Sequence, residues 1–192
     1  MKTRLAAEVG DPTALAIYRR LAEQVLAAVR MEADYSITVA YAPGSAGRAV
    51  REWLGTSVAL RPQSGGNLGA RMAGAIADAK SSGAQRVVVI GTDCPEVTAA
   101  VVKEAFDRLG GVDVVLGPAT DGGYYLIGMA RLHSMLFEDV PWSSPETLRI
   151  TLELARGAGL SIALLEERRD VDTVDDWRAW LASEAQAFDT PW

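Results

Sequence analysis

The amino-acid sequence predicts an α/β fold in which helices cover a mostly parallel central sheet. Segments with helical and strand periodicity alternate along most of the chain, as they do in parallel β-α-β units. The segment 87–90 contains only valine and isoleucine, without polar alternation, and so indicates a strand buried on both faces. Loops that follow predicted strands carry aspartates, and sheets of this kind bind ligands where their strands end.

Each element is predicted from a local pattern. Helices are expected where apolar residues recur at helical spacing behind a cap, as after Asp11-Pro12 and Ser144-Pro145. Strands are expected where β-branched runs end at glycine or proline. The predicted order is helix 11–30, strand 35–41, helix 46–54, strand 57–60, helix 68–81, strand 87–90, helix 97–109, strands 113–116 and 123–129, helix 144–156, strand 160–165 and a helix after 173.

The two ends of this pattern differ. At the carboxyl end, Thr173 and Asp176 have the spacing of an acidic capping box at the start of the last helix. At the amino end no strand precedes the helix at 11–30, although a helix that crosses between parallel strands needs a strand on each side. We therefore expect the sheet to lack a strand at its start.

Length and composition predict one domain, residues 1–192, and exclude several functions. With 192 residues and 49% hydrophobic content, the chain can bury one core. The net charge of -6 argues against nucleic-acid or anionic-membrane partners, which need a basic surface. One cysteine, Cys94, and one histidine leave no material for a disulfide or a Cys/His zinc site. Without an apolar span or a signal-peptide pattern, the protein is expected to be cytoplasmic.

Four aspartates lie in loops that follow predicted strands: Asp93, Asp121, and the pair Asp170 and Asp172. Loops at the carboxyl ends of parallel strands meet at one edge of the sheet. Two carboxylates at such an edge repel each other unless a cation lies between them, and Mg²⁺ or Mn²⁺ prefers oxygen ligands shared with substrate phosphates. These acids therefore predict a metal-diphosphate site.

Each acid also has an ordinary structural explanation, which the sequence leaves open. Asp93 suits a turn or an N-cap, Asp121 suits the Asp-Gly of a β-turn, and Asp172 suits an N-cap. Asp170 is equally consistent with surface charge.

The glycine-rich loop from Gln63 to Gly69 is the second candidate site. Gly65, Gly66 and Gly69 would let the backbone approach a base or a phosphate, and the helix behind them points free N–H groups outward. The alternative is a long loop that uses glycine only for turning.

Two basic and three aromatic residues could complete the site. Lys2 and Arg4 could neutralise a diphosphate, with Arg4 as a bidentate donor, or could be solvated at the terminus. Tyr124, Tyr125 and Trp142 could line a sugar or base pocket, or could pack in the core.

Five stretches of the sequence together resemble one protein family. They are Lys2-Thr3-Arg4-Leu5, Gly65-Gly66-Asn67-Leu68-Gly69 with Arg71-Met72, Gly91-Thr92-Asp93-Cys94-Pro95, Leu116-Gly117-Pro118 with Asp121-Gly122-Gly123-Tyr124-Tyr125, and Asp170-Val171-Asp172-Thr173. Over nearly its whole length the sequence resembles a bacterial family of unknown function that is described as glycosyltransferase-like. That family belongs with the nucleotide-diphospho-sugar transferases of GT-A fold and is similar to the 2-phospholactate and molybdenum-cofactor guanylyltransferases.

The resemblance implies a Rossmann-like three-layer sandwich with Asp93 as a metal-binding residue and Asp172 as the second metal ligand. It also implies that the glycine-rich loop meets the nucleotide. The residues that it assigns to nucleotide binding are Gln63, Gly65, Gly66, Leu68, Gly69, Arg71 and Thr92.

The chain departs from the family pattern in two places. The family begins with a strand and a Pro-Gly turn before Val-Lys-Thr-Arg-Leu, whereas Met1 stands here at the valine position. The domain is therefore expected to be N-terminally incomplete, without the first strand of its sheet. The family's glycine loop commonly carries aspartate where this chain has Asn67, which argues against a metal ligand there.

The expected function is Mg²⁺-dependent transfer from a nucleotide-activated donor. The leading hypothesis is glycosyl transfer from a nucleoside diphosphate sugar to a small acceptor. Asp121 would orient or deprotonate the acceptor, and Lys2 and Arg4 would assist the leaving diphosphate. The alternatives are nucleotidyl transfer from an NTP to a phosphorylated acceptor and a non-catalytic nucleotide-binding domain. The sequence does not indicate the oligomeric state.

Overall fold

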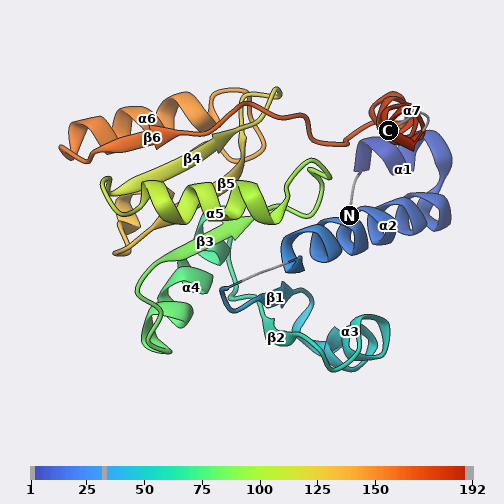
Figure 1. Cartoon of the computed structure of the whole chain (residues 1–192), viewed down its shortest axis with the longest axis horizontal. Helices are drawn as coiled ribbons and strands as arrows, with labels where there is room; N and C mark the ends of the chain where they lie inside the picture. The colour runs from blue at the N-terminus through green and yellow to red at the C-terminus, as the bar shows by residue number, and fades with distance from the viewer. Residues whose placement is uncertain (1–2, 32–33, 189–192) are drawn as a thin grey trace.

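The computed structural model describes residues 3–31 and 34–188, which form an α/β fold with two β-sheets (Figure 1). The elements are α1 Thr3–Val9, α2 Asp11–Arg30, β1 Thr38–Tyr41, η1 Gly44–Ala46, α3 Gly47–Leu54, β2 Ala59–Pro62, α4 Leu68–Ser81, β3 Val87–Ile90, α5 Ala99–Arg108, β4 Val114–Pro118, β5 Tyr124–Met129, η2 Ser134–Phe137, α6 Thr147–Gly157, β6 Ile162–Leu164 and α7 Val174–Phe188. None of the helices in this part of the chain is long and apolar enough to cross a membrane.

Most elements lie where their local patterns predict them. The observed bounds of α2, α4 and β3 coincide with the predicted ranges. Other boundaries move by a few residues. The strand β2 begins at Ala59 rather than at residue 57, and α6 begins at Thr147 rather than at Ser144.

Helix α1 has no counterpart among the elements predicted from local patterns. This helix has seven residues, too few to be stable alone, so it depends on tertiary packing. Leu5 is fully buried in an apolar cluster with Ile17 and Leu21 of α2 and Val174 of α7. Lys2, which the sequence analysis assigns to the site, lies outside the described residues.

The sheet is split and mixed, so the prediction of one mostly parallel sheet is wrong. The strands β1 and β2 form a two-stranded parallel sheet, and a second sheet has the order β3-β5-β4-β6. In the second sheet β5 runs antiparallel to both of its neighbours, β3 and β4, whereas β4 and β6 are parallel.

The direction of β5 follows from the short connection that precedes it. Only residues 119–123 separate β4 from β5. A connection this short joins antiparallel strands, because a parallel partner needs a crossover of about a dozen residues or more. The turn is closed by hydrogen bonds from Gly122 N–H to the Ala119 carbonyl and from Ala119 N–H to the Gly123 carbonyl, both 3.0 Å.

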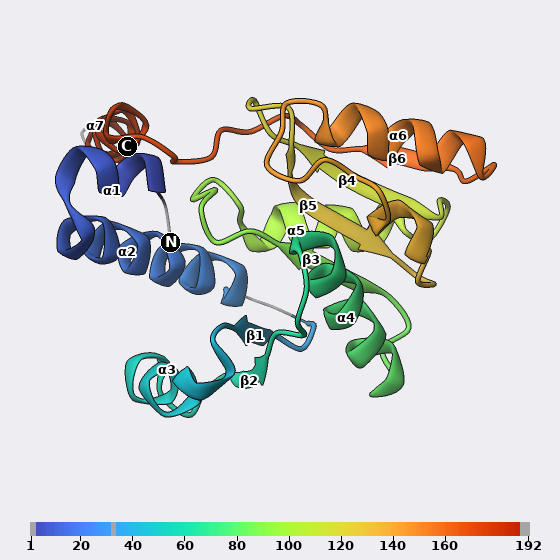
Figure 2. The same ribbon diagram turned by 180° about the vertical axis from the view of Figure 1, so that it is seen from behind.

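Helices cover both faces of the four-stranded sheet. On one face α2 and α5 pack in a cluster with Val115 and Leu126, and on the other α4 and α6 pack in a cluster with Leu116 and Ile127. Successive residues of each strand therefore point to opposite helical layers, as the pleat requires. Figure 1 shows α5 in front of the sheet, and Figure 2 shows α4 in front of it.

Candidate functional site

Two acidic segments lie side by side at one edge of the four-stranded sheet. The backbone N–H of Val171 donates to the carbonyl oxygen of Asp93 at 2.8 Å. Asp93 follows β3, and Val171 lies between Asp170 and Asp172 in the segment that leads from β6 to α7. This bond brings the backbones of Asp93 and Asp172 close together, although the two residues are far apart in the sequence.

The carboxyl group of Asp93 lies against the backbone of Gly91. A Cβ atom on Gly91 would lie only 2.6 Å from Oδ1 of Asp93, so a larger residue there would require the Asp93 carboxyl group to shift. The hydroxyl of Thr92 donates to that of Tyr18 in α2 at 3.4 Å. Cys94 is fully buried in the core, and this burial raises the pKa of its thiol to about 12.

Thr173 and Asp176 form the predicted capping box at the start of α7. The backbone N–H and the hydroxyl of Thr173 donate to Oδ2 of Asp176 at 3.0 and 2.7 Å, and the N–H of Asp176 donates back to that hydroxyl at 3.1 Å. The N–H of Asp172 donates to the same carboxyl oxygen at 3.2 Å. Burial acts to raise the pKa of Asp176, but these hydrogen bonds outweigh it and lower the pKa below its usual value.

Asp121 lies in the turn between β4 and β5. Its Oδ1 accepts the N–H of Gly123 at 2.8 Å, so the residue has the turn role that the sequence left open. The N–H of Thr120 donates to the carbonyl of Arg168 at 3.0 Å. The turn therefore lies beside the segment that continues to Asp170.

These segments surround a cavity of about 350 Å³. Its lining residues are Arg4, Thr120, Asp121, Arg169, Asp170, Asp172, Thr173 and Asp176. The cavity thus brings together Arg4 and three of the four predicted aspartates, Asp121, Asp170 and Asp172. Asp93 does not line it but belongs to the segment bonded to Val171.

Arg169 is a candidate site residue that the sequence motifs do not indicate. It lines the cavity, and its Nη1 lies 4.0 Å from Oδ1 of Asp176. A pair of arginines directly before the acidic turn is the signal that could have identified it. The other arginine of the pair, Arg168, contacts Glu96 at 3.3 Å and Glu166 at 3.1 Å, and so ties this segment to the loop after β3.

The cavity is negative on balance, because its lining contains four carboxylates and two guanidinium groups. It would repel an anionic nucleotide unless a cation came with it. Within residues 3–31 and 34–188, no group of three or more His, Cys, Asp or Glu side chains is arranged for a metal. Mg²⁺ and Mn²⁺ accept one or two protein carboxylates completed by substrate phosphates. The oxygen donors of the two segments therefore fit a metal ion that is shared with substrate.

Asn67 and Arg71 hold the glycine-rich loop. Asn67 is the N-cap of α4, and its side chain accepts the N–H of Ala70 at 2.9 Å. Arg71 donates from Nε to the carbonyl of Gly66 at 3.1 Å and from Nη1 to Oε1 of Gln63 at 3.4 Å. The loop is therefore ordered by its own side chains.

The remaining loop residues have different surroundings. A Cβ atom on Gly65 would meet no atom within 4 Å, and Leu68 is 50% exposed. Gly69 is covered instead, since a Cβ atom there would overlap the indole ring of Trp142 and lie 2.7 Å from the Phe137 carbonyl oxygen. Glycine at position 69 thus serves packing, whereas Gly65 remains open to a ligand.

The predicted aromatic residues pack in the core. Tyr125 is 2% exposed, and its hydroxyl donates to the carbonyl of Glu166 at 3.1 Å. The ring of Trp142 stacks on Phe137 with centroids 6.5 Å apart and meets Tyr124 edge-on at 6.3 Å. The sequence left open whether these aromatic residues line a sugar or base pocket or pack in the core. The contacts show that they pack in the core.

One segment connects the glycine-rich loop with the Asp121 turn. Trp142 covers Gly69, and three residues further along Pro145 lies against Gly122. A Cβ atom on Gly122 would overlap the carbonyl oxygen of Pro145 and lie 2.6 Å from its Cα. Gly122 also has a φ of +87°, a conformation that favours glycine. The segment from Trp142 to Pro145 therefore contacts both the glycine-rich loop and the Asp121 turn.

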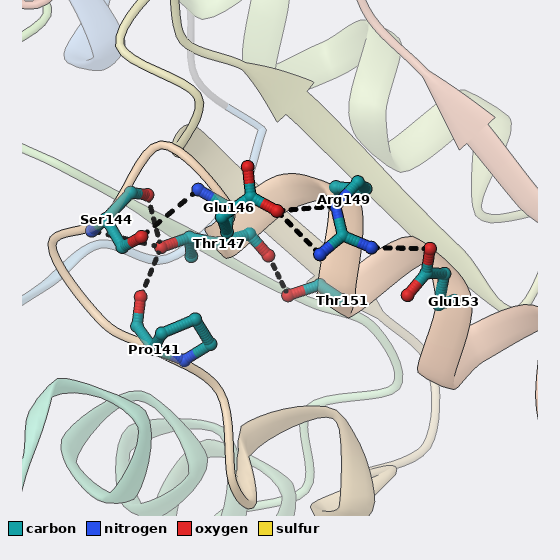
Figure 3. A network of polar contacts seen from close by, with 7 residues as sticks. All are labelled: Pro141, Ser144, Glu146, Thr147, Arg149, Thr151 and Glu153. Carbon is teal, nitrogen blue, oxygen red and sulfur yellow. Dashed lines mark hydrogen bonds and ion pairs between the residues drawn. The ribbon is translucent and has the colours of Figure 1, made fainter.

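A buried threonine fixes this segment (Figure 3). The Oγ1 of Thr147 donates to the carbonyl oxygens of Pro141 and Ser144, at 2.7 and 2.8 Å, and its single proton is shared between them. The carbonyl of Thr147 accepts the hydroxyl of Thr151 at 2.8 Å. On the exposed side of α6, Arg149 pairs with the glutamates on either side of it.

We expect Thr147→Val to lower the free energy of unfolding by about 2 kcal/mol, because valine keeps the shape but leaves the Pro141 carbonyl oxygen without its donor and the Ser144 N–H without its acceptor. Thr151→Val is the matched control. The Thr151 hydroxyl donates to the carbonyl of Thr147, for which a backbone N–H of helix α6 is also available. The loss of free energy of unfolding should therefore be smaller. Urea unfolding followed by circular dichroism measures both, and equal losses would contradict the role given to Thr147.

Comparison with solved structures shows which proteins share this fold. A Desulfovibrio desulfuricans G20 protein, whose name assigns it provisionally to the nucleotide-diphospho-sugar transferases, matches with a TM-score of 0.87 and 33% identity over 94% of this chain and 79% of that chain. Rv0371c of Mycobacterium tuberculosis H37Rv, crystallised with manganese, matches at 0.60 and 19% over 85% and 86%. CMP:2-keto-3-deoxy-manno-octonic acid synthetase, complexed with CTP, matches at 0.57 and 14% over 88% of each chain. The fold is thus shared with sugar and nucleotidyl transferases.

The chain belongs to the DUF2064 family, described as an uncharacterized protein conserved in bacteria, whose model matches residues 25–144. The family that the sequence motifs indicate is thereby confirmed. No curated protein sequence matches the chain.

Proposed function

We propose that the protein is a Mg²⁺- or Mn²⁺-dependent transferase that moves a glycosyl group from a nucleoside diphosphate sugar to a small acceptor. The observation that carries the proposal is the hydrogen bond between Val171 N–H and the Asp93 carbonyl, which joins two acidic segments beside the cavity. The fold shared with sugar and nucleotidyl transferases supports it.

Asp93 and Asp172 would hold the metal ion, which when bound supplies positive charge for the departing diphosphate. Arg4 and Arg169, on the cavity wall, would add guanidinium groups that bind phosphate oxygens in pairs. A relative with the same fold, Rv0371c, was crystallised with manganese, which is consistent with this ligand chemistry.

Asp121 would act on the acceptor. The acceptor hydroxyl attacks the anomeric carbon of the sugar, the bond from that carbon to the diphosphate breaks, and the hydroxyl proton passes to the carboxylate of Asp121. Because Oδ1 of Asp121 accepts the N–H of Gly123, the turn fixes the orientation of the carboxyl group, and Oδ2 would be the oxygen that accepts the proton.

The glycine-rich loop would bind the nucleotide. Gly65 is open, and Gly66 adopts a φ of +96°, so the backbone here can approach a ligand closely. Gln63, Leu68 and Arg71 flank it, and the N-terminus of α4 adds a favourable potential for phosphate.

Nucleotidyl transfer is the second candidate, and the two arginines in the cavity favour it specifically. A phosphorylated acceptor would be bound by Arg4 and Arg169, and one of its phosphate oxygens would attack the α-phosphorus of an NTP. The bond to the β-phosphate would break, and pyrophosphate would leave.

The released product distinguishes the two reactions. We expect the purified chain, given a panel of nucleoside diphosphate sugars and acceptors, to release a nucleoside diphosphate with Mg²⁺ and none with EDTA. Release of pyrophosphate from an NTP panel would establish the second candidate instead. As a control, Asp121→Asn should stop transfer while nucleotide still raises the melting temperature, because this variant changes the acceptor side only. Binding without any product would contradict both reactions.

A further inference from the structure

Residues 165–173 join β6 to α7 and run past the loop between β3 and α5 (Figures 1 and 2). Within this β6–α7 connection, the backbone of Arg168 pairs with the chain that leads into the Asp121 turn. Its N–H donates to the Pro118 carbonyl at 3.1 Å, and its carbonyl accepts the N–H of Thr120 at 3.0 Å. The backbone of Arg168 therefore holds the β6–α7 connection beside the turn.

The side chain of Arg168 reaches a third part of the candidate site, the loop 91–98 that follows β3 and carries Asp93. Its Nη1 donates to Oε2 of Glu96 in that loop at 3.3 Å, and its Nη2 donates to Oε2 of Glu166 in its own connection at 3.1 Å. The Arg168 side chain is only 19% exposed, whereas those of Glu96 and Glu166 are 49% and 80% exposed. Of the two ion pairs, the one with Glu96 is therefore less screened by solvent.

Two polar contacts between described residues join the loop 91–98 to the β6–α7 connection. One is the hydrogen bond from Val171 N–H to the Asp93 carbonyl at 2.8 Å, and the other is the ion pair between Arg168 and Glu96. The second contact lies three residues from the first on each segment. One hydrogen bond alone would let the loop pivot about it, whereas two separated contacts fix its orientation. Arg168 thus supplies a constraint that the backbone bond lacks.

Stability alone does not explain the position of this side chain. Among the described residues, the buried Nε of Arg168 has no hydrogen-bond partner. Removing a guanidinium group from water with one donor unused costs free energy, which offsets much of the gain from its ion pairs. In some proteins a buried charge is retained for the geometry that it imposes rather than for stability. The contact with Glu96 is accordingly best explained by the position that it gives the loop.

We infer that Arg168 is a positioning residue for the metal ion of the proposed transferase, because it sets the spacing between the segments that carry Asp93 and Asp172. The inference rests on the proposed function, which assigns these two aspartates to the metal. Mg²⁺ and Mn²⁺ need oxygen ligands at nearly fixed distances, so metal affinity depends on that spacing. Residues that orient metal ligands without touching the metal typically change metal affinity by about 10- to 100-fold.

Variants of the pair formed by Arg168 and Glu96 separate the effect of position from that of charge. Glu96→Gln removes a negative charge and Arg168→Gln removes a positive one, so electrostatics alone would weaken cation binding in the first variant and strengthen it in the second. Loss of position weakens binding in both. We expect both variants to bind Mn²⁺ about tenfold more weakly than the parent. The double variant should lose no more than either single variant, because all three lack the same contact.

Calorimetry of the full chain measures the affinity in two arms, with Mn²⁺ alone and with its pyrophosphate complex. Glu166→Gln is the matched control, since it removes an ion pair of the same guanidinium group that lies within one segment. Its Mn²⁺ affinity should stay within about twofold of the parent. Arg168→Lys keeps the charge and should retain part of the affinity.

Amide hydrogen exchange reports the geometry without any metal. The amide of Val171 should exchange at least about threefold faster in Arg168→Gln than in the parent, because the loop that carries its acceptor is no longer fixed. Leu165, whose N–H donates to the Leu116 carbonyl at 2.9 Å, is the internal reference and should not change.

The outcomes distinguish this inference from the proposed function. If Asp93→Asn lost Mn²⁺ affinity while Arg168→Gln kept it, the positioning role would be overturned and the proposed metal site would stand. Tighter binding by Arg168→Gln, or an equal loss in Glu96→Gln and Glu166→Gln, would show an effect of charge and would also overturn the role. A parent chain that bound Mn²⁺ in neither arm would refute the proposed metal site and this inference with it.

Discussion

We expect the Asp93→Asn variant to lose turnover by at least about 100-fold while its melting temperature stays within about 3 °C of the parent. The amide has nearly the shape of the carboxyl group, so it can occupy the space beside Gly91, but it lacks the negative charge that a divalent cation needs. The Mg²⁺ concentration for half-maximal rate should rise for any activity that remains. Initial rates at a series of Mg²⁺ concentrations measure both effects.

Asp107→Asn is the control for this variant. Asp107 lies on the exposed side of α5, where its carboxylate contacts Lys103 at 3.1 Å. Its substitution removes one negative charge far from the acidic edge and should leave the rate and the metal dependence unchanged. An Asp93→Asn variant as active as the Asp107→Asn variant would refute the proposed metal site.

The largest loss of stability is expected for Gly122→Ala, which should lower the free energy of unfolding by about 4 kcal/mol. The φ of +87° is unfavourable for alanine, and the new Cβ atom would overlap backbone atoms of Pro145, which cannot move aside as the end of a side chain could. The neighbouring Asp121 would be displaced with the turn. Denaturant unfolding measures the stability, and the product assay measures the loss of transfer.

Gly159→Ala separates the two causes. Gly159 has a φ of +69°, but a Cβ atom there would meet no atom within 4 Å. This variant carries the conformational cost alone, about 1 kcal/mol. If both variants lost the same stability, the contact between Gly122 and Pro145 would not be what holds the turn.

Local patterns explain why most elements are predictable from the sequence. The cap of α4 is Asn67, which bonds a residue three positions away, and the capping box of α7 spans Thr173 to Asp176. Such contacts depend on residues within one helical turn. They are therefore visible in the sequence before any tertiary contact is known.

The pairing of strands could be predicted only in part. The antiparallel direction of β5 follows from the length of the connection at 119–123, which the sequence already shows. The division between β1 and β3 was not visible, because 87–90 has the composition of an inner strand whether or not it has two partners. Helix α1 was missed since it depends on burial of Leu5 among residues of α2 and α7.

The acidic part of the candidate site was predictable because its aspartates follow strand ends. That rule gathers Asp121 and Asp172 in the cavity and Asp93 on the adjoining segment. The role of Gly69 was not predictable, because it depends on Trp142, a residue distant in the sequence. The sequence shows a glycine at position 69, but it does not show which side chain packs against that glycine.

The hydrogen bond between Val171 and Asp93 is made entirely by peptide groups, and this has a consequence for how the family can change. Replacing Asp93 or Asp172 would remove a proposed metal ligand but leave the hydrogen bond between the two segments intact. The backbone structure of this edge and its proposed metal binding can therefore change independently. Under the proposed metal site, family members that differ at only one of these aspartates should fold alike and differ in metal affinity.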